Sequence, residues 1–489
     1  MSKKEQQEIS RQLFGTDGMR GRANEGAMSA EVALQLGRAV GYLLYKKGAQ
    51  IGRPRPQVVI GKDTRVSGYL IENALVAGLC SSGVDVFLAG PLPTPGVALL
   101  TQSRRADAGL MISASHNPYE DNGVKIFSRD GYKLPDEEEL MIESLMHGQG
   151  CEAFGESHLE QIRPHHWHGS IELNQHRPIG NEIGRAARIS DAIGRYNVMA
   201  KQALNSSVSL SGLKVVIDCA HGAAYKVAPQ VLQELGAEVI SIGVEPNGTN
   251  INDHCGATHT DALVARVGIE QADLGIALDG DADRCILVDE RQQVLDGDQI
   301  LAILGRFMQQ KGTLKGSCVV TTVMSNLGLE AALKPHGIKV ERVQVGDRYV
   351  VAKMRELNSN LGGEQSGHTI LRDIATTGDG LVTALSVLGV MVQEHKKLSE
   401  LGAEMQHFPQ ALKSFTVKAK PPLSALPKTS TLIKQVEADL VDQGRVLVRY
   451  SGTQQMARVM VEGQDVTQVN QLVQEISQQM LNEIETISL

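Results

Sequence analysis

Short β-branched runs recur along the chain, each followed by a glycine-containing loop and then by apolar residues at helical spacing. Examples of these runs are Val58–Ile60, Lys214–Ile217 and Val319–Val323. This alternation is typical of βαβ units, so it predicts a largely parallel sheet with helices between successive strands. Ligands of such sheets bind at the loops beyond the carboxyl ends of the strands. We therefore expect functional residues in the loops that follow these strands.

Helical patterns are clear near both ends of the chain. Ser29 can cap a helix that Gly48 ends, with apolar positions at Val32, Leu36, Val40, Leu43 and Leu44. Near the C-terminus, the strand-like runs RVLVRY and ARVMVEG precede an amphipathic helix. Strands that cluster before a helix predict a small α+β domain.

Two stretches interrupt these patterns. Residues 147–182 lose apolar periodicity and become polar and rich in histidine, which predicts an insertion or linker. A proline-rich stretch at 418–430 is expected to separate the preceding α/β part from the last domain. With the motifs below, these features predict four domains, at residues 1–182, 183–297, 298–410 and 411–489.

Composition narrows the class of protein. The 489 residues suit three or four domains, each with its own core. The chain has 48 Lys and Arg against 56 Asp and Glu, a formal charge of −8, and only 3% aromatic residues. Few aromatics and an acidic balance argue against a nucleic-acid partner. Any anion site must therefore be a local concentration of positive charge.

Cysteines and apolar runs bear on the compartment. The six cysteines occur singly, as reduced thiols do in cytosolic proteins. No apolar region follows the start MSKKEQQEIS, and the longest apolar run, Leu381–Val392, is too short to cross a bilayer. We expect a cytoplasmic protein without a membrane partner.

The strongest local signal is LDGDADR, in which Asp279, Asp281 and Asp283 alternate between two apolar runs. Three crowded carboxylates repel one another unless a cation neutralises them, and oxygen ligands suit Mg²⁺ or another hard cation. An EF-hand loop would place Glu290 at position twelve, but position six is Arg284 where that turn needs glycine. An acidic surface turn is the plainer alternative. The pattern favours the metal site.

Residues 112–125, ISASHNPYEDNGVK, follow the apolar run Leu110–Ile112. A serine at the end of a buried strand stands where a nucleophile would be exposed, and both Ser113 and Ser115 qualify. Lys125 is close enough in sequence to reach a phosphate. Turn hydrogen bonds from Ser and Asn are the alternative interpretation.

Two further loops carry polar groups beside glycines. GGEQSGH, at 362–368, offers Glu364, Ser366 and His368 to a sugar-like ligand, although a glycine-rich surface turn would read the same way. RYSGT, at 449–453, together with Arg458 offers two guanidinium groups and two hydroxyls to a phosphate. Two surface arginines beside a turn are the alternative.

Six of the 14 histidines fall within 147–176, at positions 147, 158, 165, 166, 168 and 176. A zinc site is conceivable there, but no cysteine pair or H-E-x-x-H frame accompanies them. A solvated insertion is the better interpretation.

In this order, the loops resemble those of the α-D-phosphohexomutase superfamily across nearly the whole chain. The matching stretches are FGTDGMRG (14–21), ISASHNPYEDNGVK (112–125), LDGDADRC (278–285), VGDRYV (345–350), GGEQSGH (362–368) and RYSGTQQMARVMVEG (449–463). The resemblance implies three similar α/β domains with mixed, largely parallel sheets, plus a C-terminal α+β domain, around a central active-site cleft. It also implies one functional loop per domain, for phosphoserine, metal, sugar and phosphate in turn. FGTDGMRG and Gln365 favour the branch that acts on glucosamine phosphates.

The resemblance also implies roles for individual residues. The phosphoryl group would be carried by Ser115, and one Mg²⁺ per chain would be held by Ser115, Asp279, Asp281 and Asp283. Glu364 and Ser366 match the sugar-binding positions, and Arg449, Ser451, Gly452, Thr453 and Arg458 match the phosphate-binding loop. Arg20, His116, Lys125, Arg284 and His368 match catalytic positions for charge stabilisation or proton transfer.

The reaction implied is exchange of a phosphoryl group between the 6- and 1-positions of a hexosamine phosphate through a sugar 1,6-bisphosphate, which also serves as activator. The protein would act as a monomer or homodimer in amino-sugar metabolism. Three positions depart from the usual family motifs, namely Ala282, Gln454 and Gln455. The competing hypotheses are a glucose or mannose phosphate mutase and a weakly active paralogue that binds phosphosugars.

Overall fold

The computed structural model describes residues 13–15, 17–50, 55–147, 170–450 and 455–487. The chain divides into two compact units. Unit 1 comprises Met1–Met324 and His336–Ala403, and unit 2 comprises Ser325–Pro335 and Glu404–Leu489. Unit 1 contains three sheets and unit 2 contains one.

The first sheet of unit 1 carries residues 113–120, called the nucleophile loop below because it contains the two candidate serines. Its inner strands are parallel, and antiparallel strands extend one edge. The strand order is β1 (Phe14–Gly15), β2 (Gly18–Arg22), β6 (Asp121–Ser128), β5 (Ala108–Ile112), β3 (Gln57–Lys62), β4 (Asp85–Pro91) and β7 (Ala186–Arg188). The nucleophile loop lies between the antiparallel neighbours β5 and β6.

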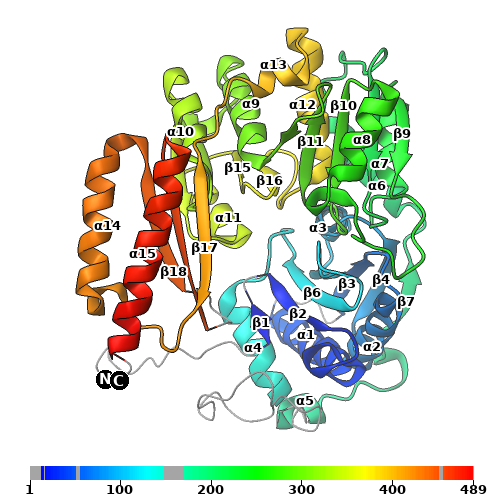
Figure 1. Ribbon diagram of the computed structural model, residues 1–489. Helices are drawn as coiled ribbons and strands as arrows, with labels where there is room; N and C mark the ends of the chain where they lie inside the picture. The colour runs from blue at the N-terminus through cyan, green and yellow to red at the C-terminus, as the bar shows by residue number, and fades with distance from the viewer. Residues whose placement is uncertain (1–12, 16, 51–54, 148–169, 451–454, 488–489) are drawn as a thin grey trace. The chain divides into compact units, whose positions relative to one another are not determined.

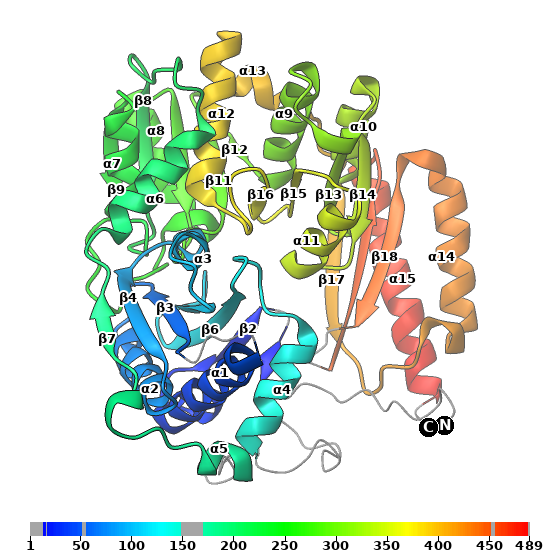
Figure 2. The ribbon, with the colours of Figure 1, turned by 180° about the vertical axis from the view of Figure 1, so that it is seen from behind.

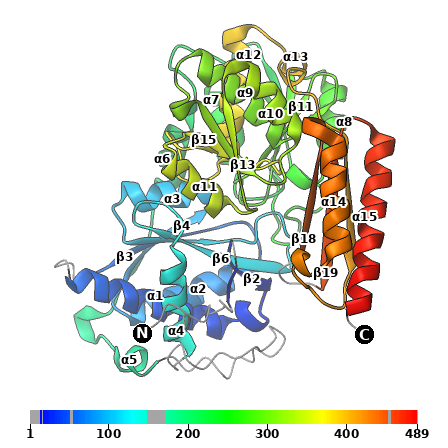
Figure 3. The same cartoon turned by 90° about the vertical axis from the view of Figure 1, so that its left-hand side faces the viewer.

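Helices cover both faces of this sheet (Figure 3). Helices α1 (Ala30–Gln50), α2 (Ser67–Ser81) and α4 (Asp136–His147) lie on one face, and α3 (Thr94–Ser103) lies on the other. Buried aliphatic residues of α1 and α2, such as Leu36 and Leu75, pack against strand residues such as Ile60 and Leu110 in one core. Because the strands are buried on both sides, they read as continuous apolar runs.

The second sheet carries residues 279–284, called the metal loop below because of the cation site predicted for its three aspartates. Its order is β12 (Val294–Leu295), β11 (Cys285–Asp289), β10 (Leu274–Leu278), β8 (Lys214–Asp218) and β9 (Glu238–Ile242). Strands β8, β9 and β10 are parallel, whereas β10 and β11 form an antiparallel hairpin. Helices α6 (Ala192–Ala200), α7 (Val227–Glu234) and α8 (Asp261–Glu270) accompany it (Figure 1).

The third sheet carries the GGEQSGH loop. Its order is β14 (Lys339–Val343), β13 (Cys318–Thr322), β15 (Leu361–Gly363) and β16 (Thr369–Leu371), with only the last pair antiparallel. Its helices are α9 (Gly297–Gln310), α11 (Asp347–Glu356), α12 (Gly380–Glu394) and α13 (Leu398–Gly402). The apolar helix α12 contacts β11 of the second sheet and β16 of the third (Figure 2). It therefore joins these two sheets inside unit 1.

Unit 2 is an antiparallel sheet in the order β17 (Gln410–Thr416), β19 (Met456–Glu462) and β18 (Arg445–Tyr450). Its helices are α10 (Leu327–Leu333), α14 (Pro427–Leu440) and α15 (Val466–Ile487). One apolar face of α15, including Val469, Val473, Ile476, Met480 and Ile484, is buried in the core of the unit. The predicted C-terminal α+β domain is confirmed.

The fold class and the predicted elements agree with the structure. The three β-branched runs coincide with β3, β8 and β13, except that Val323 lies just beyond the end of β13. The helix expected after Ser29 is α1, which continues past Gly48 to Gln50. No helix among the described residues is long and apolar enough to cross a membrane.

Two expectations about connecting stretches differ from the structure. The proline-rich stretch does not precede the last sheet, because β17 comes before it and pairs with β19. In the polar stretch 147–182, residues 148–169 lie outside the described residues, but α5 (Ile171–Gln175) is helical and buries Leu173 against the first core. A single anchoring leucine gives no periodicity, which explains why the pattern suggested only a linker. Strand β7 lies beyond the domain boundary predicted after residue 182, yet it pairs with β4 and belongs to the first sheet.

Candidate active site

The three aspartates converge at the tip of the β10–β11 hairpin. Leu278 pairs with Cys285 across the hairpin, and the six residues between them form the loop. One carboxylate oxygen from each of Asp279, Asp281 and Asp283 lies within 4.8 Å of the other two, and all three residues are buried. Ala282 turns the loop with a φ of 57°, a left-handed conformation in which glycine is more usual. Alanine at this position is therefore compatible with the turn.

The electrostatics of this cluster fit a cation. Burial, together with the charges of Asp283 and Asp281, raises the pKa of Asp279 to about 8. Within the part of the chain that the structure describes, the Oδ1 atoms of Asp281 and Asp283 are buried and accept no hydrogen bond, and of the two only Asp283 Oδ1 has an ion-pair partner, His368 Nδ1 at 3.6 Å. Unsatisfied buried carboxylate oxygens are costly, and a hard divalent cation is the ligand that would satisfy them.

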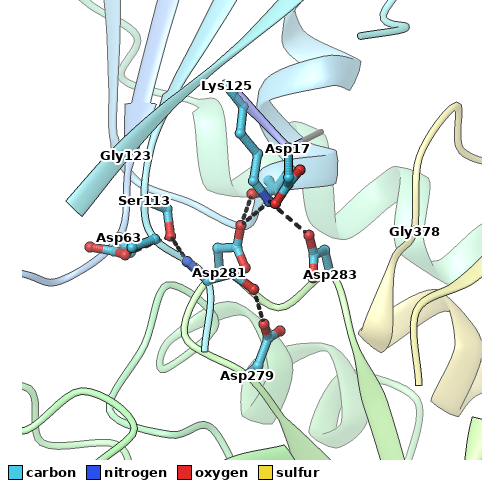
Figure 4. Close-up of polar contacts among 12 residues, drawn as sticks. Asp17, Asp63, Ser113, Gly123, Lys125, Asp279, Asp281, Asp283 and Gly378 are labelled. Atoms are coloured by element: carbon cyan, nitrogen blue, oxygen red, sulfur yellow. Dashed lines mark hydrogen bonds and ion pairs between the residues drawn. The ribbon is translucent and has the colours of Figure 1, made fainter. Parts of the chain in front are cut away.

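The Oδ2 atoms of Asp281 and Asp283 accept hydrogen bonds from other side chains of unit 1 (Figure 4). Lys125 Nζ donates to the Oδ2 atoms of Asp281 and Asp283, at 2.9 Å each, and Thr94 Oγ1 donates to Asp281 Oδ2 at 2.6 Å. Burial disfavours the charged ammonium, but Asp17 and the loop aspartates outweigh it and raise the pKa of Lys125 well above its usual value. Lys125 is therefore a fixed positive charge beside the candidate metal ligands.

The nucleophile loop separates the two serines that the sequence left as alternatives. Ser115 Oγ donates to Asp279 Oδ2 at 2.6 Å and lies 3.4 Å from His116 Nδ1. Ser113 Oγ instead donates to Asp63 Oδ2 at 2.7 Å and accepts from the Ser115 amide at 2.9 Å. Only the hydroxyl of Ser115 is directed to the metal loop.

Arginine side chains surround the same loops. Arg20 pairs with Asp17 and donates through Nη1 to Ala114 O at 3.3 Å. The backbone amide of Arg284 donates to Asp279 Oδ1 at 3.1 Å. Burial and the nearby charges of Arg284 and Arg20 lower the pKa of His116 to about 4, so its imidazole is neutral near pH 7.

The GGEQSGH loop spans the turn between β15 and β16. His368 is buried, with Nδ1 3.6 Å from Asp283 Oδ1 and Nε2 3.7 Å from Asp347 Oδ2. Glu364 Oε1 accepts from the Gly346 amide at 3.1 Å, and Ser366 Oγ is exposed 3.5 Å from Glu364 Oε2. His368 thus contacts the metal loop, while Glu364 and Ser366 offer polar groups for a ligand.

Two cations of unit 2 stand directly opposite each other, because Arg449 on β18 pairs in register with Arg458 on β19. Burial and the charge of Arg458 lower the pKa of Arg449. Among the described residues, no hydrogen-bond partner reaches the buried Nε of Arg458. Two facing guanidinium groups favour a bound anion. The predicted ligands Ser451, Gly452 and Thr453, and the motif change at Gln454, lie outside the described residues.

Three side chains at the site were not singled out from the sequence. Asp17 lies among Lys125, Lys133 and Arg20, and these charges outweigh its burial and hold its pKa well below the usual range. Arg65 and Asn252 both donate to the backbone of the nucleophile loop. The GKDTR stretch after β3 could have suggested Arg65, since loops at strand ends carry function. Asn252 has no comparable signal.

The alternative metal sites fare differently. The EF-hand interpretation is wrong, because β10 and β11 are strands and Glu290 accepts from Ser399 Oγ at 2.5 Å instead of facing the loop. Four of the six clustered histidines, at 158, 165, 166 and 168, lie outside the described residues. Of the other two, His176 contacts Ser82 O at 3.1 Å through Nε2.

Four family sequence profiles match the chain. They are described as the alpha/beta/alpha domains I, II and III and the C-terminal domain of phosphoglucomutase/phosphomannomutase, and they match residues 11–150, 195–293, 296–408 and 391–479. The chain belongs to the phosphoglucomutase/phosphomannomutase family, which confirms the resemblance seen in its motifs.

Within this family, relatives called phosphoglucosamine mutase match over nearly their full length. The relative from Syntrophotalea carbinolica is 51% identical, covering 96% of this chain and 97% of its own. The relative from Geotalea daltonii is 52% identical with the same coverage. Identity at this level over whole chains favours the glucosamine branch.

Solved structures show the same fold at much lower identity. A phosphoglucomutase/phosphomannomutase family protein from Burkholderia thailandensis has a TM-score of 0.75 and 21% identity, covering 97% of this chain and 98% of its own. The N-acetylphosphoglucosamine mutase of Aspergillus fumigatus, in complex with GlcNAc-6P and magnesium, has a TM-score of 0.62 and 17% identity, covering 96% of both chains. These structures support the fold alone.

Proposed function

We propose that this chain is a phosphoglucosamine mutase, an isomerase that interconverts glucosamine 6-phosphate and glucosamine 1-phosphate through a phosphoserine at Ser115. The observation that carries the proposal is the buried hydroxyl of Ser115, 2.6 Å from Asp279 Oδ2 at the edge of the tri-aspartate loop. Whole-chain identity of 51–52% to relatives of that name supports the choice of substrate.

The donor set suits one Mg²⁺, which Asp279, Asp281, Asp283 and the phosphoserine would hold. When bound, the ion supplies positive charge to the phosphoryl group as it is transferred. The buried Asp281 Oδ1, which has no hydrogen-bond partner in the described chain, supports this assignment.

The reaction consists of two successive phosphoryl transfers. In the first, the bond from Ser115 Oγ to phosphorus breaks and the free hydroxyl of the sugar phosphate forms a new bond to phosphorus, giving the 1,6-bisphosphate. In the second, the other phosphate of this intermediate returns to Ser115 Oγ, so the sugar leaves as its isomer. Sugar 1,6-bisphosphate added from outside primes an unphosphorylated chain by the same second step.

The side chains around Ser115 supply charge and proton transfer. The guanidinium groups of Arg20 and Arg284 stabilise the negative charge of the transferring group. A base must take the proton of the attacking hydroxyl, and the candidates are His116, Lys125 and His368. Of these, only His116 is neutral near pH 7, because nearby carboxylates outweigh burial and raise the pKa of Lys125 well above its usual value and the pKa of His368 to about 9. Replacing each in turn and recording turnover against pH identifies the base, because its loss removes one limb of the profile.

The substrate is held by groups on separate loops. Glu364 and Ser366 contact sugar hydroxyls, and the facing pair of Arg449 and Arg458 binds the phosphate that is not transferred. Ser451, Gly452 and Thr453 complete this phosphate loop. Phosphate recognition of this kind accepts either orientation of the sugar, which an interconversion of 1- and 6-phosphates requires.

Each task corresponds to one proposed domain, at 1–182, 183–297, 298–410 and 411–489. We infer a cytoplasmic enzyme of amino-sugar metabolism, a monomer or homodimer, with no nucleic-acid or membrane partner. The free cysteines among the described residues and the relation to bacterial enzymes support this placement.

One experiment tests the central proposal. The purified chain is incubated with Mg²⁺ and glucosamine 1,6-bisphosphate, and intact mass and peptide mapping are used to locate one added phosphate. We expect it on Ser115, with turnover of glucosamine 6-phosphate exceeding that of glucose and mannose 6-phosphates. Preference for glucose or mannose phosphate would overturn the substrate assignment, and the absence of phosphate would favour a binding paralogue.

A further inference from the structure

The carbonyl groups of the nucleophile loop are held by two side chains from connections of different sheets, Arg65 after β3 and Asn252 after β9. Arg65 Nη2 donates to Ser115 O at 2.9 Å and to Asn117 O at 2.7 Å. Asn252 Nδ2 donates to the same two oxygens, at 2.9 and 3.0 Å. Each carbonyl therefore accepts from both donors.

The backbone of Ser115 is fixed on its amide side as well. Its N–H donates to Ser113 Oγ, which in turn donates to Asp63 Oδ2. Asp63 Oδ2 also accepts from Arg65 Nε at 2.8 Å, and both of these side chains are completely buried. The amide and the carbonyl of Ser115 are thus tied to one buried Asp63–Arg65 pair.

Fixing matters here because Ser115 has a φ of 55°. The left-handed region is unfavourable for a non-glycine residue, and such residues persist only where the surroundings over-determine them. Without the four donated hydrogen bonds, Ser115 would relax to an ordinary conformation, and its Oγ would leave Asp279.

Asn252 also lies against the metal loop. A Cβ atom at Gly280 would come within 2.6 Å of Ser115 O and 2.9 Å of Asn252 Nδ2. The missing side chain of Gly280 therefore lets Asn252 and the nucleophile loop approach the metal loop. The backbone N–H of Asn252 donates to Ala220 O at 2.9 Å, which anchors Asn252 to the loop after β8 of the second sheet.

We infer that Arg65 and Asn252 are positioning residues for phosphoryl transfer, which together lock Ser115 in its left-handed conformation with Oγ directed at the metal loop. The inference rests on the proposed function. Asn252 extends this control across two sheets, since it lies in the connection between β9 and β10 of the second sheet and holds a loop of the first. Neither residue touches the reacting atoms.

The test uses Asn252→Asp in the full chain. The substitution keeps the shape of the side chain but turns the donor into a carboxylate that repels both carbonyl oxygens. Displacement of a reacting group by about 1 Å can cost about 100-fold in rate. We expect phosphorylation of Ser115 by glucosamine 1,6-bisphosphate, followed by intact mass, to slow 10- to 100-fold at saturating bisphosphate. The KM of the substrate should change less than threefold, because the sugar-binding groups are untouched.

The matched control is Asn247→Asp in the same loop. It adds the same charge, and its exposed side chain keeps the acceptor role that Asn247 Oδ1 has toward the Thr249 amide, at 2.9 Å. Its phosphorylation rate should stay within twofold of the wild type. This comparison separates the loss of the two hydrogen bonds from a general effect of charge.

Two further variants keep the inference falsifiable. Asn252→Ala removes the donor without adding charge, and Arg65→Lys keeps the charge but cannot reach several acceptors with one planar fork. Both should slow phosphorylation while the protein stays folded at the assay temperature, with thermal midpoints lowered by the loss of buried hydrogen bonds. A folded Asn252→Asp variant that is phosphorylated at the wild-type rate would overturn the inference, as would unfolding of both Asn252 variants. Failure of the wild type to be phosphorylated would instead count against the proposed function.

Discussion

The nucleophile loop and the metal loop each turn at a non-glycine residue in the left-handed conformation, but they are held in different ways. In the metal loop, the Ala282 amide donates to Asp279 O, and its carbonyl accepts from Gly380 N, both at 3.0 Å, while the β10–β11 hairpin closes the loop. The turn at Ser115 has one such backbone hydrogen bond, from the Asn117 amide to Ala114 O at 3.1 Å, and its carbonyl groups are held in addition by the side chains of Arg65 and Asn252.

This difference has a physical consequence. Backbone hydrogen bonds between neighbouring strands survive most side-chain substitutions, so the metal loop should keep its shape when its own residues change. The nucleophile loop should lose its shape when a remote side chain is removed. Substitutions in the two loops should therefore separate loss of chemistry from loss of geometry.

The largest effect is expected at the nucleophile itself. Ser115→Ala removes the oxygen that carries the phosphoryl group, so turnover should fall about 10⁴-fold or more, with no phosphate gained from glucosamine 1,6-bisphosphate. Intact mass and a turnover assay measure both. In the Ser113→Ala variant, phosphate should still be transferred to Ser115, although at a lower rate. Phosphate on Ser113 in the Ser115→Ala variant would contradict the assignment made from the hydroxyl directions.

Asp279→Asn should lower turnover about 100-fold, because one anionic ligand of the cation is lost while the hairpin remains. Without metal, the same substitution should stabilise the folded protein. Three buried carboxylates repel one another, so the variant should unfold at a higher temperature than the wild type in EDTA. Thermal unfolding with and without Mg²⁺ checks this. Equal stabilisation of both proteins by Mg²⁺ would argue against the metal site.

Asp379 supports the metal loop from behind, because it caps α12, whose first amide donates to Ala282 O. Burial raises the pKa of Asp379 to about 6, above its ordinary value of 3.8. The folded state thus binds this proton more tightly than the unfolded state, so its contribution to stability falls as pH rises from about 4 to about 6.

Asp379→Asn should remove this part of the pH dependence and stabilise the protein at pH 7 by about 3 kcal/mol. Asparagine is as good a helix cap as aspartate, and its oxygen can still accept from Tyr196 Oη and Val382 N. Urea unfolding at pH 4, 6 and 7 measures the effect. A variant that follows the wild-type curve across this range would refute the expectation.

The smallest effect is expected for Ala282→Gly. Glycine relieves the cost of the left-handed turn but gains freedom in the unfolded chain, so the free energy of unfolding should change by no more than about 1 kcal/mol. Turnover should stay within about twofold of the wild type. A large loss of activity would show that the alanine methyl group, which is fully buried, has a packing role beyond the turn.

The sequence predicted the parts of the site whose evidence is local. Alternating aspartates between two apolar runs predicted three crowded carboxylates, and the structure brings them together at the tip of the β10–β11 hairpin. Alternation of strands and helices predicted the α/β sheets. The roles carried over by resemblance, such as those of Lys125 and His368, remain proposals, although both side chains contact the metal loop.

What the sequence by itself determined is therefore which chemical groups stand in each loop, and that each loop follows a strand. The tertiary structure decided which serine hydroxyl is directed at the aspartates and what keeps it there. Arg65 and Asn252 are 50 and 137 residues from Ser115, the first of the two residues whose carbonyl groups they share. No local spacing encodes such a contact, because it exists only once two sheets have packed and a glycine has let their loops approach.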